Sequence, residues 1–315
     1  MSKIIISEFM DQDAVEWLQG LHQVHYEPDL YSQREKLSHL LRHAEALIVR
    51  NRTHVDTELL DSAPQLSVVG RLGVGLDNID SQACKNRGVQ VIPATGANAA
   101  AVAEYVICCA MMLLRGAYGA SRATAEGQWP RDTLINGQEI AGKTLGIIGF
   151  GSVGRRTAEL ALAVGMQVIA YDPSLNEAAL PQHLRIQPRP DVDTVLHEAD
   201  VVSLHVPLIP ATRNLIDAQR ISSMKRGAIL INVARGGVLD EAALAHSLAD
   251  GHLGGAALDV YATEPLPGGT VLANAPNLIL TPHIAGVTKQ SNIRVSTMIA
   301  EHVHHALHHK SRRQQ

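Results

Sequence analysis

Short apolar runs separated by helix-patterned segments recur along this 315-residue chain in two series. Strands that alternate with helices in this way are typical of parallel, doubly wound sheets. We therefore expect an α/β protein with two such sheets, the second of six strands. The expected strands are Ile4–Ser7, Val24–Tyr26, Ala46–Val49, Ser67–Gly70 and Val89–Ile92 in the first series, and Ile147–Phe150, Val168–Tyr171, Val201–Val206, Ile229–Val233, Ala256–Val260 and Leu278–Leu280 in the second.

A glycine-rich segment, Gly149-Phe150-Gly151-Ser152-Val153-Gly154, follows the first run of the second series. It lies between an apolar run and a segment, residues 155–164, with helical apolar spacing. In such a strand–turn–helix motif the three glycines permit the turn, the approach of a pyrophosphate and the packing of helix on strand. The helix N-terminus favours an anion. We expect Gly149, Gly151, Ser152, Val153 and Gly154 to bind a dinucleotide; a helix-packing turn without a ligand is the alternative.

Asp172 ends the next apolar run, at about the spacing of a carboxylate that holds an adenosine ribose 2′-OH. No arginine directly follows it. Because a 2′-phosphate would meet a negative charge there, the sequence favours NAD over NADP as the cofactor.

Two long helix-patterned segments set the expected domain boundaries. Residues 98–114 are apolar on most faces, which indicates a buried helix that leads from one unit into the other. Residues 288–309 form a second long helix, which we expect to cross back onto the N-terminal unit. The expected domains are a Rossmann cofactor domain at 98–287 and a smaller, flavodoxin-like substrate domain at 1–97 plus 288–315. A cleft between two domains is a usual place for a small-molecule site.

Composition excludes several classes of function. A net charge of −4 argues against a nucleic-acid or membrane-surface binder, which would need a basic face. The N-terminus becomes acidic at Glu8 before a signal-peptide core forms, and the longest apolar stretch, Val106–Leu114, is too short to span a bilayer. Cys84, Cys108 and Cys109 lack metal or disulfide spacing, and we expect them to be reduced and buried. These features favour a cytoplasmic protein.

Three polar residues follow consecutive strands of the second series: Arg235, Glu264 and His283. A strand-end guanidinium can bind a carboxylate bidentately. A histidine there can exchange a proton with a carbonyl oxygen, and a paired glutamate would orient the ring and favour its charged form. Alone, each residue has a common structural explanation: a salt bridge, a turn or a satisfied polar group. Their shared position, on the side expected to hold nicotinamide, favours catalysis.

The chain resembles the D-isomer-specific 2-hydroxyacid dehydrogenase family over nearly its whole length. The resemblance implies hydride transfer between C4 of nicotinamide and C2 of a 2-hydroxy or 2-oxo acid, by an enzyme that is usually a homodimer. It rests on Arg71–Asp80, Ala103-Glu104, the glycine fingerprint, His205–Leu208 with Thr212, Asn232–Gly236, Leu258–Val260 with Glu264-Pro265, and Thr281–Gly286.

Roles for individual residues are also implied by this resemblance. Arg235 would bind the substrate carboxylate and keto oxygen, His283 would be the acid/base and Glu264 its partner. Asp259 would hold the nicotinamide carboxamide. The resemblance further places Pro207, Thr212, Ala234 and Ala285 at the cofactor, with Thr212 near the diphosphate, and assigns the substrate carboxylate to backbone N–H groups of Leu72, Gly73, Val74 and Gly75.

The N-terminal domain must distinguish among the substrates of this family. Arg50 fits the family pattern, whereas Arg52 stands where many phosphoglycerate relatives have a small residue. A second guanidinium suits a second anionic group on the substrate, such as sulfonate or phosphate. Sulfolactate is therefore the preferred substrate, with 3-phosphoglycerate and glycerate or hydroxypyruvate as alternatives; Arg52 could instead pair with a surface acid.

Two further interpretations concern the C-terminal histidines and a different class of function. The histidines at 302, 304, 305, 308 and 309 include pairs at helical spacing that could chelate a metal. A solvated helix end is the commoner explanation, and the expected chemistry needs no metal. Relatives that act as NAD-sensing binding proteins or co-repressors provide the alternative to an enzyme.

Overall fold

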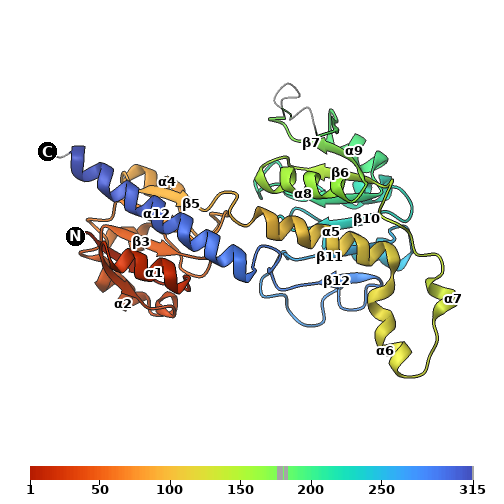
Figure 1. Cartoon of the computed structure of the whole chain (residues 1–315), viewed down its shortest axis with the longest axis horizontal. Coiled ribbons are helices and arrows are strands. Elements are labelled where there is room, and N and C mark those ends of the chain that lie inside the picture. Colours follow the sequence, from red (N-terminus) through yellow and green to blue (C-terminus); the bar gives the residue numbers. More distant parts are fainter. Residues whose placement is uncertain (176–179, 181–183, 314–315) are drawn as a thin grey trace. The chain divides into compact units, whose positions relative to one another are not determined.

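The computed structural model describes residues 1–175, 180 and 184–313 (Figure 1). The chain divides into two compact units: unit 1 comprises Met1–Asn98 and Val287–Gln315, and unit 2 comprises Ala99–Gly286. Each unit is built around one parallel sheet, of five strands in unit 1 and seven in unit 2, which confirms the expected α/β class. Within the described ranges, no helix combines the length and apolar character that crossing a lipid bilayer requires.

The sheet of unit 1 has the strand order β2-β1-β3-β4-β5, with every neighbouring pair parallel. This is the flavodoxin-like order. The strand β3 is buried throughout because helices cover both faces of the sheet. The strands are β1 (Lys3–Ile6), β2 (Gln23–Tyr26), β3 (Ala46–Val49), β4 (Val68–Arg71) and β5 (Gln90–Pro93).

Two helical layers enclose this sheet. The first contains α1 (Gln12–Gln19) and α12 (Lys289–Arg313), whose apolar residues share one core cluster with β1, β3 and β4. At Gly70 in β4 an added Cβ would lie 2.7 Å from Val303 of α12, so this contact requires a residue without a side chain. The opposite layer comprises α2 (Arg34–Leu41), α3 (Thr57–Asp61) and α4 (Ser81–Asn86), with a short 3-10 helix at Leu30–Ser32.

The sheet of unit 2 has the order β12-β11-β10-β9-β6-β7-β8 and is also entirely parallel. Its first six strands in sequence follow the Rossmann order. The expectation of six strands was wrong, because Ile186–Pro188 forms the additional strand β8 at one edge. This segment is short and contains Gln187 and Pro188, so it lacks an apolar run; proline is tolerated at a sheet edge. The strands are β6 (Thr144–Ile148), β7 (Gln167–Tyr171), β8 (Ile186–Pro188), β9 (Val201–Leu204), β10 (Ile229–Asn232), β11 (Gly255–Leu258) and β12 (Leu278–Leu280).

Helices also cover both faces of this second sheet. On one face lie α5 (Ala99–Arg115) and α8 (Ser152–Ala163), and on the other α9 (Val192–Glu198), α10 (Ala218–Ser223) and α11 (Glu241–Ala249). Cys108 on α5 is exposed, contrary to expectation, because it shares the solvent face of that helix with Glu104 and Met111; Cys84 and Cys109 are buried. The remaining helices of unit 2 are α6 (Ala120–Ala125), α7 (Arg131–Leu134) and a 3-10 turn at Ala117–Gly119.

Candidate active site

The glycine fingerprint forms the turn from β6 into α8. Gly149 has φ +96°, and an added Cβ there would lie 2.7 Å from the carbonyl oxygen of His205. At Gly154 an added Cβ would lie 2.3 Å from the carbonyl oxygen of Gly149, which explains the close packing of α8 on β6. Gly151 is different, because among the described residues no atom beyond its two chain neighbours lies within 4 Å of the position of its missing Cβ. The open space at Gly151, beside the helix N-terminus that Ser152 and Val153 begin, fits a dinucleotide diphosphate.

Asp172 follows the last residue of β7 and contacts the glycine turn. Its carboxylate accepts a hydrogen bond from the backbone N–H of Phe150 at 2.8 Å, and from the N–H and hydroxyl of Ser174 at 2.8 and 2.6 Å. Burial alone would raise the pKa of Asp172, but the hydrogen bonds from Ser174 and Phe150 outweigh it, and the pKa lies below its usual value. The carboxylate is therefore ionised at neutral pH, and its remaining lone pairs can accept from a ribose hydroxyl.

Substitution of Asp172 by Asn tests this role. Loss of a charge-assisted hydrogen bond should weaken NAD binding about 10- to 100-fold and lower the discrimination against NADP, because the negative charge is removed. The measurement is kcat/KM for NAD and NADP in the same assay. The exposed Asp132→Asn on α7 provides a control of equal charge change. An unchanged NAD-to-NADP ratio in Asp172→Asn would exclude a ribose contact.

The loops after β9 and β10 contain three residues expected at the cofactor. The Thr212 hydroxyl donates to the carbonyl of Pro207 at 2.5 Å and accepts from the N–H of Ile209 at 2.9 Å, so it shapes its own loop. Ala234 is buried, and its N–H donates to Oδ1 of Asn232 at 3.0 Å. Both loops leave the carboxyl ends of neighbouring strands, which meet at one edge of the sheet.

Arg235 is half-buried in the loop after β10. Its Nη1 donates to the carbonyl of Ala234 at 2.6 Å, and its own carbonyl accepts from Nδ2 of Asn232 at 3.1 Å. Asn232 therefore positions both residues, a role that the sequence analysis did not identify. An added Cβ at Gly236 would lie 1.7 Å from the carbonyl oxygen of Tyr261, so the Arg235 loop contacts the loop after β11 directly.

Glu264 and His283 lie together in the loops after β11 and β12. The distance between Oε2 of Glu264 and Nδ1 of His283 is 2.8 Å, and the side chains are 37% and 48% exposed. Oε1 of Glu264 accepts from the N–H of Tyr261 at 3.1 Å, which fixes the carboxylate. A carboxylate only accepts, so Nδ1 of His283 is the donor and Nε2 can exchange a proton with another group. His283 also has φ +57°, an uncommon conformation outside glycine that is concentrated at functional sites.

Asp259 is almost fully buried and organises the His283 loop. Its carboxylate accepts from the Thr281 hydroxyl at 2.6 Å and from the N–H groups of Ile284 and Ala285 at 2.8 and 2.7 Å. The Tyr105 hydroxyl lies 2.6 Å from that of Thr281, and burial raises the pKa of Tyr105 above its usual value. The described hydrogen bonds of the Asp259 carboxylate are therefore with the segment that carries His283.

In unit 1, the loop from Arg50 to Thr53 is held by a residue that the sequence analysis did not assign to the site. The carboxylate of Glu8, 3% exposed, accepts from four consecutive backbone N–H groups at 2.8 to 3.1 Å. Nδ2 of Asn78 also donates to the carbonyl of Thr53 at 2.7 Å. The only sequence signal is a carboxylate that follows an apolar strand, so its partners more than 40 positions away could not be recognised.

The two arginines of this loop have different surroundings. Nη2 of Arg50 donates to Oδ1 of Asn292 at 3.0 Å, and burial lowers the pKa of Arg50. Arg52 is exposed; its Nη1 donates to the Tyr31 hydroxyl at 2.6 Å, and its guanidinium lies 4.9 Å from the centre of the Tyr31 ring. Within the described part of the chain, Arg52 contacts this aromatic ring and forms no ion pair with a carboxylate.

The expected carboxylate-binding loop follows β4. The N–H of Leu72 donates to the carbonyl of Val49 at 2.8 Å, and that of Gly73 to the carbonyl of Arg71 at 2.7 Å. Gly73 has φ +152°, and an added Cβ would overlap the Arg71 guanidinium. Because Leu72 and Gly73 already donate, Val74 and Gly75 are the residues of this loop whose N–H groups have no acceptor among the described residues.

The Rossmann strand order, the glycine turn and the carboxylate–imidazole pair define a nicotinamide-dependent dehydrogenase. Residues 107–285 match the family model for the NAD-binding domain of D-isomer specific 2-hydroxyacid dehydrogenases. The chain belongs to this family, and it is an NAD-binding 2-hydroxyacid dehydrogenase that acts on small 2-hydroxy or 2-oxo acids.

Individual relatives resemble nearly the whole chain. It is 49% identical to a (S)-sulfolactate dehydrogenase of Chromohalobacter salexigens over 98% of this chain and 99% of the relative. Identity to a hydroxypyruvate reductase of Thermotoga maritima is 35%, over 96% of this chain and 97% of the relative. Among solved structures, the TT0316 protein of Thermus thermophilus superposes on this chain with a TM-score of 0.87 at 32% sequence identity. The superposition covers 97% of each of the two chains.

Proposed function

We propose that this dehydrogenase interconverts sulfolactate and sulfopyruvate. The observation that carries the proposal is the pair of guanidinium groups, Arg50 and Arg52, on one loop whose backbone Glu8 holds. The similarity of the whole chain to a (S)-sulfolactate dehydrogenase supports the same substrate. Sulfolactate carries a sulfonate in addition to its carboxylate. It therefore needs a second cationic side chain, whereas a simple 2-hydroxy acid needs only one.

The surroundings of Arg52 suit a sulfonate. The Tyr31 ring and hydroxyl restrict the guanidinium without forming an ion pair with it. The three sulfonate oxygens can accept several hydrogen bonds from the five N–H donors of an arginine. These donors form a planar fork that a lysine cannot reproduce.

The proposed roles of the remaining residues are those that the family resemblance implies, and the contacts of Glu264 and His283 support them. NAD, when bound, supplies the hydride acceptor at C4 of its nicotinamide. Arg235 binds the substrate carboxylate. Nε2 of His283 takes the C2 hydroxyl proton during oxidation and returns it during reduction, while Glu264 holds the ring through Nδ1 and stabilises its charged form. We also infer a homodimer, the usual assembly of this family.

A substrate screen with NAD, following NADH absorbance, tests the proposal. The panel contains both enantiomers of sulfolactate, 3-phosphoglycerate, glycerate and lactate. We expect the highest kcat/KM for sulfolactate. Arg52→Met should lower that value about 10- to 100-fold, because a charge-assisted hydrogen bond is lost, and should leave glycerate oxidation nearly unchanged.

Arg42→Met, an exposed change at the end of α2, is the matched control and should leave all substrates unaffected. Preference for 3-phosphoglycerate, glycerate or lactate would reject sulfolactate while leaving the family assignment intact. Absence of turnover with every acid, combined with NAD-dependent assembly, would favour an NAD-sensing protein.

A further inference from the structure

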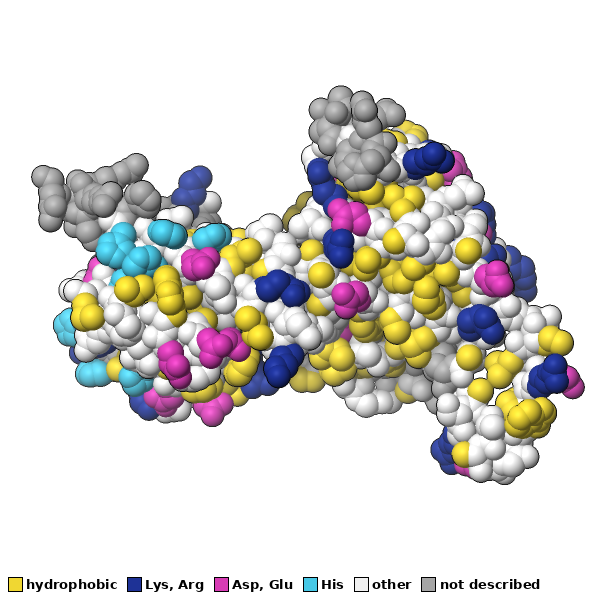
Figure 2. Space-filling view, in the orientation of Figure 1, with side chains coloured by type: hydrophobic (Ala, Val, Ile, Leu, Met, Phe, Trp, Pro, Cys, Tyr) yellow, Lys and Arg dark blue, Asp and Glu magenta, His cyan; other side chains and the backbone are white. Residues whose placement is uncertain are grey.

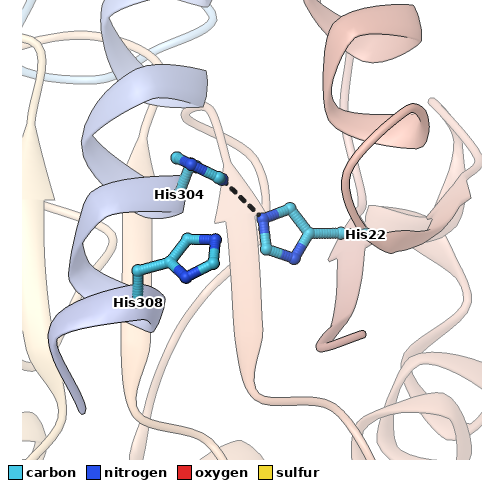
Figure 3. Close-up of side chains that lie close together, drawn as sticks. All are labelled: His22, His304 and His308. Atoms are coloured by element: carbon cyan, nitrogen blue, oxygen red, sulfur yellow. Dashed lines mark hydrogen bonds between the residues drawn. The ribbon is translucent and has the colours of Figure 1, made fainter. Parts of the chain in front are cut away.

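Histidine side chains gather on one face of unit 1, and none of them belongs to the residues assigned to catalysis (Figure 2). Three histidines of unit 1, His22, His304 and His308, lie together (Figure 3). His304 and His308 lie one turn apart on α12, and His22 belongs to the turn between α1 and β2. The distance between Nε2 of His22 and Nδ1 of His304 is 2.9 Å, and the ring centres of His304 and His308 are 4.4 Å apart. One nitrogen from each residue lies within 4.8 Å of the other two.

The backbone that carries these rings is fixed by packing. Val303 and Leu307 of α12 are buried in the same core cluster as Leu18 of α1, so the helix face with His304 and His308 is held opposite the turn with His22. The Trp17 ring also packs edge-on against His304, with ring centres 5.3 Å apart. Little conformational entropy therefore remains to be lost when a ligand brings the three rings together.

The cluster is also prepared to donate lone pairs. His22 is only 6% exposed, and burial, followed by the proximity of His304 and His308, lowers its pKa. Burial likewise lowers the pKa of His304, with His308 and His305 contributing. These two imidazoles are therefore neutral at neutral pH, the form that binds metal ions.

We propose that His22, His304 and His308 bind a divalent transition-metal ion, with Zn²⁺ as its representative. A tetrahedral ion with Zn–N distances near 2.0–2.1 Å separates its ligand nitrogens by about 3.4 Å. The present separations, 2.9 Å for one pair and no more than 4.8 Å for any pair, bracket this value. Three imidazoles suit Zn²⁺, Cu²⁺ or Ni²⁺, whereas Mg²⁺ and Ca²⁺ require oxygen ligands. The exposed position of His308 leaves the fourth ligand to water.

Bound metal would join the C-terminal helix to the turn between α1 and β2. Histidine pairs within the helix are visible in the sequence, whereas His22 lies 282 positions from His304 and joins them only in the folded unit. The expected function is structural, a clamp on α12, and it does not depend on the proposed substrate.

Isothermal titration of untagged, chelator-treated protein with Zn²⁺ tests the site. We expect saturable binding of one ion per chain and a rise in Tm on addition of Zn²⁺. His308→Ala, an exposed change that does not endanger folding, should weaken binding at least ~10-fold and abolish the rise in Tm. His302→Ala on the same helix, two positions from His304 and thus on another face, should bind like the wild type.

Two further measurements keep the outcome decisive. Co²⁺ in place of Zn²⁺ should give the intense visible absorption of a four-coordinate ion, and His304→Ala and His22→Ala, each checked by circular dichroism, should lose it. Wild-type affinity in His304→Ala and His308→Ala, or a weak six-coordinate Co²⁺ spectrum, would overturn the proposal. So would binding that requires His302.

Discussion

Replacement of His283 by Ala should lower kcat about 10²- to 10⁴-fold while the affinity for NAD stays nearly unchanged. The imidazole of His283 is fixed by Glu264 through Nδ1, which leaves Nε2 to exchange a proton. Its removal deletes the proton acceptor without touching the glycine turn or Asp172, so binding of the cofactor should persist.

Stopped-flow NADH absorbance and direct NAD titration separate these two effects. His246→Ala is the matched control, since this histidine of α11 has a side chain that is 84% exposed. The kcat of Glu264→Gln should lie between the values of the wild type and His283→Ala, because an amide can orient the imidazole ring without stabilising its charge. Full turnover in His283→Ala would exclude it as the acid/base.

Replacement of Glu8 by Gln should destabilise the loop from Arg50 to Thr53. The carboxylate accepts hydrogen bonds from four backbone N–H groups, two at each oxygen. In glutamine an NH2 group replaces one of these oxygens, so two of the backbone N–H groups face a donor instead of an acceptor. Two buried donors left without acceptors cost about 2–6 kcal/mol. The loop carries both arginines of the proposed substrate site, so KM should rise while NAD binding remains.

Hydrogen exchange of the peptide that contains residues 50–53 gives a local readout. Its amides should exchange faster in Glu8→Gln, and chemical denaturation should show the lower free energy of unfolding. Glu35→Gln, an exposed change on α2, should alter stability by no more than about 0.5 kcal/mol. Unchanged exchange at residues 50–53 would show that the loop does not depend on Glu8.

Sequence periodicity was sufficient to predict the α/β class, since buried parallel strands are apolar runs that alternate with helices. It failed at β8, where Gln187 and Pro188 interrupt the run and pairing with β7 determines the structure. Tertiary packing also overrides the local pattern at Cys108, because the elements against which α5 packs determine which face of this helix is exposed.

The candidate site divides in a similar way. The glycine turn is a local motif, so its residues can be recognised from one segment. Glu264 and His283 could be associated because they follow consecutive strands, although their roles stay predictions. Glu8 and His22 carried no such signal, since their partners lie more than 40 and 280 positions away and only the folded core brings them together.

The packing of α12 on Gly70 has a consequence for the order in which the protein can fold. Unit 2 is continuous, so all of its residues are synthesised before α12. The β1–β5 sheet, in contrast, is synthesised first, yet the part of its apolar face that α12 covers stays uncovered until residues 289–313 emerge. The core of unit 1 therefore stays incomplete, and open to aggregation, until α12 has been synthesised and has left the ribosome.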